Sequence, residues 1–79
     1  MSITYIFIDI YNIFYYHRHA MKLKELRIKA VLSQEDLAKK ANISAATVNR
    51  LEKGKTKPNF ITIRKLAEAL KVEPGEIEF

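Results

Sequence analysis

Residues 33–57, SQEDLAKKANISAATVNRLEKGKTK, are the stretch that decides the fold of this 79-residue chain. The stretch has the pattern of a helix, a tight turn, a second helix over residues 45–53 and a basic loop. Ser33 and Ser44 stand where a side-chain hydroxyl can accept from the free N–H groups of a first helical turn. Asn42 lies between the two helices, and asparagine tolerates the left-handed conformation that ends a helix. We therefore predict two short helices that cross steeply.

The second helix has a clear inner and outer face. Val48 and Leu51 are spaced at i and i+3, so both are predicted to point into the core. The residues that remain for the outer face are Ala45, Ala46, Asn49 and Arg50. Two short helices in this arrangement form a helix-turn-helix, a motif whose second helix can enter the DNA major groove.

The length and the charge of the chain limit the classes of protein to which it can belong. The chain is long enough for one domain with a small core, and it contains no cysteine. Its 14 basic and 9 acidic residues give a net charge of +5, and residues 21–79 carry the whole excess. A basic surface attracts polyanions, of which nucleic acid is the most common. The absence of cysteine is typical of a reducing cytoplasm.

Residues 1–20 differ in composition from the rest of the chain. They hold six of the eight aromatic residues and no lysine, and their Ile, Tyr and Phe residues favour a β-strand. The run is too short and too interrupted for a membrane span, which needs about 20 apolar residues. One hypothesis is a strand that pairs with its copy in a second subunit. The alternative is an upstream sequence read as protein, with Met21 as the true start.

The rest of the chain shows helical periodicity. A first helix is expected over about residues 22–30, with Leu23, Leu26 and Ala30 inward. A fourth is expected over about residues 60–70, and a single helical turn after Pro74. The inward residues expected of the fourth helix are Ile63, Leu66, Ala67 and Leu70. Ile77 and Phe79 are expected to close the core.

Four motifs stand out between residues 23 and 77: SQExLA at 33–38, LExGK at 51–55, Pro58, and LAxxL at 66–70. Through these motifs, residues 23–77 resemble the DNA-binding domain of the Cro/C1-type (XRE) transcriptional regulators. The resemblance implies an all-α, five-helix repressor-like domain at residues 21–79, preceded by the hydrophobic arm. Members of the family usually carry glycine where Val31 stands, so either the first helix ends differently here or the position is strained.

The expected base-contacting residues lie at the exposed start of the second helix of the motif, and the resemblance implies the same four: Ala45, Ala46, Asn49 and Arg50. Arg50 can donate two hydrogen bonds to guanine, and Asn49 can form two with adenine. The two alanines offer only methyl groups, so part of the specificity is expected to come from DNA shape.

Phosphate contacts are expected from the residues around the recognition helix. Gln34 can bind a phosphate at the start of the first helix of the motif, as the matching glutamine does in the family. Lysines and polar residues of the basic loop can do the same. The full expected set is Gln34, Ser44, Thr47, Lys53, Lys55, Thr56, Lys57 and Asn59. The resemblance also implies a structural ion pair between Arg27 and Glu52.

The leading interpretation is a sequence-specific repressor that binds double-stranded DNA at an inverted repeat as a homodimer, in the cytoplasm and on the nucleoid. The dimer would form through residues 1–20 or through residues 70–79. Two alternatives stay open: an antitoxin that binds a toxin protein, and an interaction module that has lost DNA binding. No enzyme activity, cofactor or membrane partner is expected, since the sequence contains no motif for one. No metal site is expected either, since His17 and His19 have no third ligand nearby.

Overall fold

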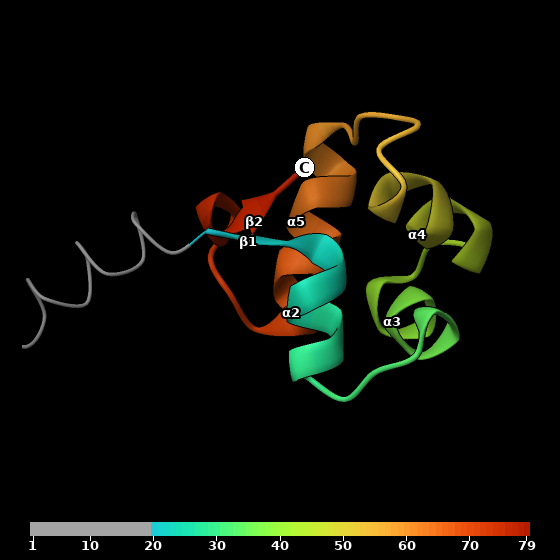
Figure 1. Ribbon diagram of the computed structural model, residues 1–79, viewed down its shortest axis with the longest axis horizontal. Helices are drawn as coiled ribbons and strands as arrows, with labels where there is room; N and C mark the ends of the chain where they lie inside the picture. The colour runs from blue at the N-terminus through green and yellow to red at the C-terminus, as the bar shows by residue number, and fades with distance from the viewer. Residues whose placement is uncertain (1–19) are drawn as a thin grey trace, which may run out of the picture.

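The computed structural model describes residues 20–79, and within that range the fold is mostly helical (Figure 1). The expected all-α fold class is confirmed. The elements in chain order are β1 (Met21–Lys22), α2 (Leu23–Lys29), α3 (Gln34–Ala41), α4 (Ala45–Glu52), α5 (Phe60–Leu70), the 3₁₀ turn η1 (Pro74–Glu76) and β2 (Ile77–Glu78). The expectations for residues 1–19, including the arm and its two histidines, lie outside the described range.

The helix-turn-helix forms for the local reasons that the sequence contains. The Ser33 hydroxyl accepts from the N–H of Asp36 at 2.9 Å, so it caps the start of α3. Asn42 ends α3 in the left-handed conformation, with φ of 57°. Ser44 then caps α4 by accepting from the N–H of Thr47 at 3.1 Å. Only two residues separate the Asn42 cap from α4, so α3 and α4 pack directly against each other.

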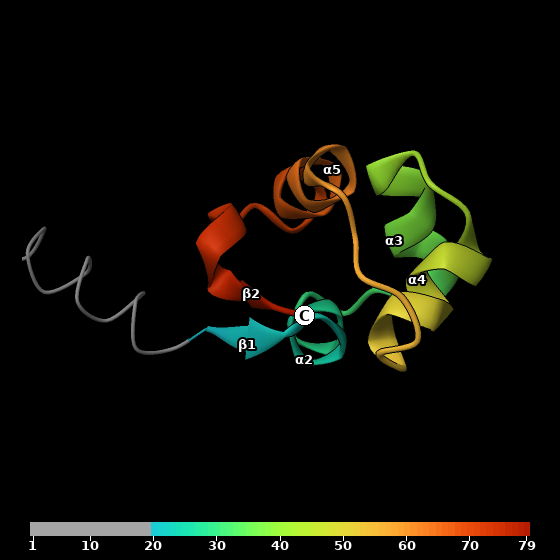
Figure 2. The ribbon, with the colours of Figure 1, turned by 90° about the horizontal axis from the view of Figure 1, so that it is seen from above.

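The core lies between α2, α3, α4 and α5. Leu37, Val48 and Leu66 are its fully buried centre, one from each of α3, α4 and α5. Figure 2 shows α5 and α2 on opposite sides of the space that α3 and α4 close at one end. Burial of these side chains stabilises the fold by about 1.5–3 kcal/mol each, which matters in so small a domain.

Two of the expected inward positions differ in the structure. Ala30 is exposed, because α2 ends at Lys29 and Ala30 is already its C-terminal cap. Ile63 is only half-buried and is not part of the buried cluster. The spacing predicted the correct face of each helix, but the helix ends and the neighbouring elements decide how deep each position lies.

Val31 takes the left-handed conformation, with φ of 58°, directly after α2. Of the two alternatives for this position, the structure contains the strained one. A β-branched residue clashes with its own backbone at positive φ, at a cost of about 1–3 kcal/mol. The Val31 side chain is 88% exposed, so almost no packing offsets that strain.

A short parallel ladder joins the two ends of the described chain. Met21 of β1 is paired with Ile77 of β2, and Lys22 with Glu78 (Figure 2). Ile77 is buried and Phe79 packs partly against the core, as expected, and η1 is the single turn expected after Pro74. The ladder was not predicted from the sequence, because two-residue strands are too short to show an alternating pattern.

Within residues 20–79 no helix combines the length and the apolar character that crossing a membrane requires.

Candidate nucleic-acid interface

Helix α4 presents one line of residues to the outside. Ala46 and Arg50 of α4 and its C-terminal cap, Lys53, are exposed and are spaced at i, i+4 and i+7, so they share one face. Val48 and Leu51 on the opposite face are buried, as the sequence predicted. The Arg50 guanidinium lies along the helix, with Nη2 3.4 Å from the Thr47 hydroxyl oxygen. The exposed face of α4 is therefore narrow and carries two cations.

Ala45 differs from its expected position on the outer face. Its methyl group is partly buried and packs against the core at the start of α4. An alanine in the first turn can still leave part of its methyl group accessible. Nevertheless, the structure leaves less of the Ala45 side chain accessible to a base than the spacing alone suggested, whereas Ala46 is exposed.

Asn49 is partly buried, at the junction of α4 with the start of α3. Its amide nitrogen Nδ2 donates to Oε1 of Gln34 at 3.3 Å. Gln34 in turn donates from Nε2 to Oε1 of Glu52 at 2.9 Å. Two residues expected to meet DNA separately are therefore joined by a hydrogen bond.

The structure contains the expected ion pair between Arg27 of α2 and Glu52 of α4. Arg27 donates from Nε to Oε2 of Glu52 at 2.6 Å and from Nη2 to Oε1 at 3.2 Å. Its Nη1 donates to the Leu32 carbonyl oxygen at 2.9 Å. The two side chains are only 12% and 4% exposed. This bidentate pair holds α2 against α4 and fixes the loop that follows α2.

The Glu52 carboxylate stays ionised because of these contacts. Burial by itself would raise its pKa. The hydrogen bonds from Arg27 and Gln34, together with the positive charges of Arg27 and Lys24, outweigh burial and hold the pKa below its ordinary value of 4.5. Glu52 is therefore an acceptor of hydrogen bonds at neutral pH.

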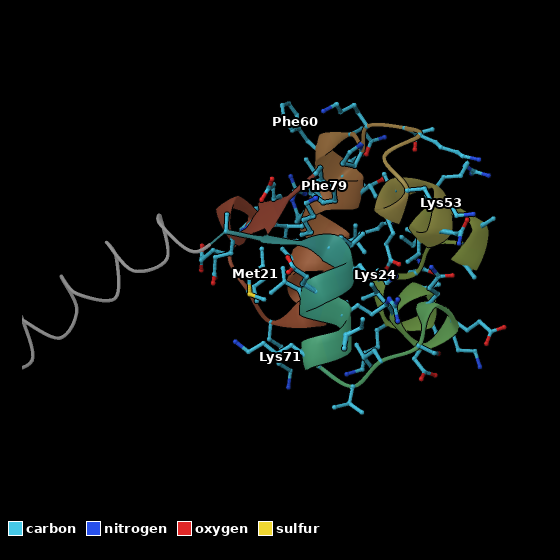
Figure 3. The ribbon with its side chains drawn as sticks, viewed as in Figure 1. Met21, Lys24, Lys53, Phe60, Lys71 and Phe79 are labelled. Carbon is cyan, nitrogen blue, oxygen red and sulfur yellow. The ribbon has the colours of Figure 1, made fainter. Side chains whose placement is uncertain are left out.

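The basic loop, residues 53–59, follows α4 directly. Figure 1 shows it running from the end of α4 to the start of α5, and Figure 3 labels Lys53 at its beginning. Lys53, Lys55, Thr56 and Lys57 are all exposed. Gly54, with φ of 71°, makes the turn, and the N–H of Lys55 donates to the Arg50 carbonyl oxygen at 3.0 Å. The loop thus places three lysines beside the exposed face of α4.

Two of the polar residues expected at phosphates already have partners inside the protein. Asn59 caps α5, because its Oδ1 accepts from the N–H of Thr62 at 2.8 Å. The Ser44 hydroxyl caps α4 and lies 2.7 Å from the Thr47 hydroxyl. Both residues are exposed or near the surface, so the caps leave room for a ligand beside them.

The hydrogen bonds of Gln34 were not predicted from the sequence. Gln34, Asn49 and Glu52 were expected to have three separate roles. The three residues are up to 18 positions apart in the chain and come together only because α3 packs on α4. Residue spacing contains no signal for such a contact.

The arrangement defines a class of protein: a helix-turn-helix domain with an exposed, cationic second helix and a lysine loop beside it. The family model described as helix-turn-helix matches residues 23–77, most of the chain. The chain belongs to this family, the Cro/C1-type (XRE) regulators, and is a DNA-binding helix-turn-helix protein. The family is one of DNA-binding proteins and not of enzymes. Neither the search of curated proteins nor that of solved structures found a match.

Proposed function

We propose that this chain is a sequence-specific transcriptional regulator of the repressor type, in which α4 enters the major groove of double-stranded DNA. The observation that supports the proposal most directly is the exposed line of Ala46 and Arg50 on α4 and Lys53 at its C-terminal cap, where the basic loop begins. A helix of this diameter fits the major groove, and flanking cations can hold the phosphates on either side. Action on DNA would place the protein in the cytoplasm, on the nucleoid.

Base recognition in this proposal depends on few side chains. Arg50 would donate to O6 and N7 of guanine, and Asn49 would contact adenine. Ala46 would contact a thymine methyl group, with a smaller contribution from the partly buried Ala45. Since direct contacts are few, DNA shape would supply part of the specificity.

Phosphate contacts would come from both ends of the motif. Lys53, Lys55 and Lys57 would bind one strand by charge, with Thr56 between them. Around the start of α3 and α4, the proposal assigns phosphates to Gln34, Ser44 and Thr47, which all lie at or near a helix N-terminus.

The decisive experiment combines a selection of bound sequences from a random DNA pool with titration of the selected site at 50 and 200 mM salt. We expect one enriched motif and a steep loss of affinity with salt. Arg50→Ala should relax preference at one base pair, by about 1–3 kcal/mol. Lys55→Ala should weaken all sequences alike and reduce the salt slope by about one unit. Failure to bind any DNA at 50 mM salt would favour an interaction module instead.

The proposal includes a homodimer on an inverted repeat, with two α4 helices about 34 Å apart. A single small domain makes few base contacts, so a second domain supplies much of the affinity. The apolar residues of the 70–79 end are largely used in the core, with Leu70 and Ile77 buried. That leaves residues 1–20 as the proposed dimer contact. Light scattering on the full chain and on a chain that starts at Met21 tests this: the first should be a dimer and the second a monomer.

A further inference from the structure

Gln34 connects two residues of α4 through its two amide atoms. Its Nε2 donates to Glu52 at 2.9 Å, and its Oε1 accepts from Nδ2 of Asn49 at 3.3 Å. The far end of this chain of hydrogen bonds is anchored by Arg27, which binds both carboxylate oxygens of Glu52. These hydrogen bonds therefore connect Arg27 of α2 to Glu52 of α4, then to Gln34 of α3, and finally to Asn49 of α4 at the proposed DNA face.

The chemistry of the carboxylate gives this chain a direction. An ionised carboxylate can only accept hydrogen bonds, so Gln34 must turn its NH₂ group toward Glu52. The carbonyl oxygen of Gln34 then faces Asn49. Asn49 must in turn point its own NH₂ group at that oxygen. A neutral partner in place of Glu52 would allow both amides to turn over.

We propose that Glu52 is a positioning residue for base recognition, which sets the direction of the Asn49 amide through Gln34. The inference rests on the proposed function, since it needs α4 to lie in the major groove. Glu52 itself touches no base, because its side chain is only 4% exposed. Its effect on DNA is transmitted by the two amides.

The direction of the Asn49 amide decides which bases it can accept. With its NH₂ group held by Gln34, the Oδ1 atom of Asn49 accepts no hydrogen bond from residues 20–79, and the amide keeps a second N–H. An acceptor next to a donor matches the N6 amino group and N7 of adenine. Guanine presents two acceptors, O6 and N7, and matches poorly. The network therefore favours adenine over guanine opposite Asn49.

The test measures the preference between adenine and guanine at one base pair of the site selected by the full chain. Asn49→Ala first identifies the base pair that Asn49 reads. Gln34→Met then removes the hydrogen bonds to Glu52 and Asn49, and Glu52→Gln lets both amides turn over. Arg27→Lys is the matched control, because it weakens the ion pair but leaves a carboxylate that can only accept. Circular dichroism verifies that each variant is folded at the temperature of the titration.

We expect the wild type and Arg27→Lys to prefer adenine by about tenfold. Gln34→Met and Glu52→Gln should reduce that preference to about threefold or less. The inference would be overturned if Gln34→Met kept the wild-type preference for adenine over guanine. It would also be overturned if Arg27→Lys lost as much of that preference as Gln34→Met and Glu52→Gln do. Gln34→Met keeps the ion pair, so the test stands even where Glu52→Gln does not fold. A wild type that enriches no DNA would instead refute the proposed function.

Discussion

At the scale of single residues, Glu52 connects three helices. It belongs to α4, and its carboxylate accepts hydrogen bonds from Arg27 of α2 and Gln34 of α3. A partly buried ion pair often adds little net stability, since desolvation of both charges offsets their attraction. Removal of one partner is costly, however, because the other charge is then left buried without a counter-charge.

The lowered pKa of Glu52 makes stability depend on pH. Because the folded-state pKa lies below the ordinary value of 4.5, the ion pair contributes fully above that value. The contribution is lost as pH falls from about 4.5 through the folded-state pKa. We predict that Glu52→Gln lowers the free energy of unfolding by about 2–3 kcal/mol at pH 7, and by less at pH 3.

Urea denaturation followed by circular dichroism at both pH values measures this difference. The exposed Glu68→Gln is the control and should leave the free energy of unfolding within about 0.5 kcal/mol of wild type at pH 7. A Glu52→Gln effect that is the same at pH 3 and pH 7 would show that the carboxylate charge is not the cause.

Val31 is a second residue with a predictable effect. Glycine has no Cβ and accepts φ of 58° without strain, and the exposed valine side chain contributes almost no packing. We therefore predict that Val31→Gly stabilises the protein by about 1 kcal/mol. That gain corresponds to a rise in Tm of about 4–8 °C in a domain of this size.

The matched control is Asn42→Gly, at a position with φ of 57°. Asparagine already tolerates this conformation, so its replacement should raise Tm less than Val31→Gly does. If Val31→Gly lowers Tm in a thermal melt, the side chain contributes more than its exposure suggests.

At the scale of elements, each of α3, α4 and α5 begins with a side-chain cap. Ser33, Ser44 and Asn59 each accept from the N–H three residues later. Short helices depend on such caps, because each has four N–H groups at its start without a partner in the helix. These caps also fix where the α4 face and the basic loop begin and end.

Substitutions at Asn59 and Lys57 should therefore have different effects, the first on stability and the second on DNA binding. Asn59→Ala removes the cap of α5, and we predict a loss of about 1 kcal/mol in the free energy of unfolding. Lys57→Ala should change stability by less than about 0.5 kcal/mol and should reduce the salt slope of DNA binding by about one unit. Urea denaturation and the salt titration measure the two effects. A flatter salt slope with unchanged stability in Asn59→Ala would assign Asn59 to a phosphate instead.

At the scale of the whole molecule, the β1–β2 ladder ties the start of α2 to the C-terminal end. Ile77 of β2 connects the ladder to the core, because its side chain is only 7% exposed and belongs to the buried cluster. Phe79 packs partly against the cluster, and Figures 2 and 3 together show the C-terminal end beside the start of α2. The last residues are thus part of the folded unit.

Ile77→Ala tests how far the end of the chain contributes to folding. Loss of the buried side chain should lower the free energy of unfolding by about 2–4 kcal/mol, a large fraction of the total for a small domain. Glu78→Ala, at the exposed neighbouring position of β2, should change it by less than about 0.5 kcal/mol. Both are measured by urea denaturation. Near-wild-type stability of Ile77→Ala would show that the ladder forms outside the cooperative unit.

Much of the fold was predictable because its signals are local. The serine caps, Asn42 at the end of α3, the inward Val48 and Leu51, and the turn at Pro74 all depend on residues within four positions of each other. The candidate site was predictable as a set of positions, because a helix-turn-helix places its second helix in a fixed way. The family assignment follows from the same local motifs.

By itself, the sequence determined the all-α helix-turn-helix fold and the cationic character of α4 and its loop. Tertiary structure alone decided the depth of Ala45, the strain at Val31, the β1–β2 ladder and the hydrogen bonds from Glu52 through Gln34 to Asn49. The physical reason is distance along the chain. Caps and helical faces depend on neighbours in sequence, whereas burial and long-range hydrogen bonds depend on which elements the packing brings together.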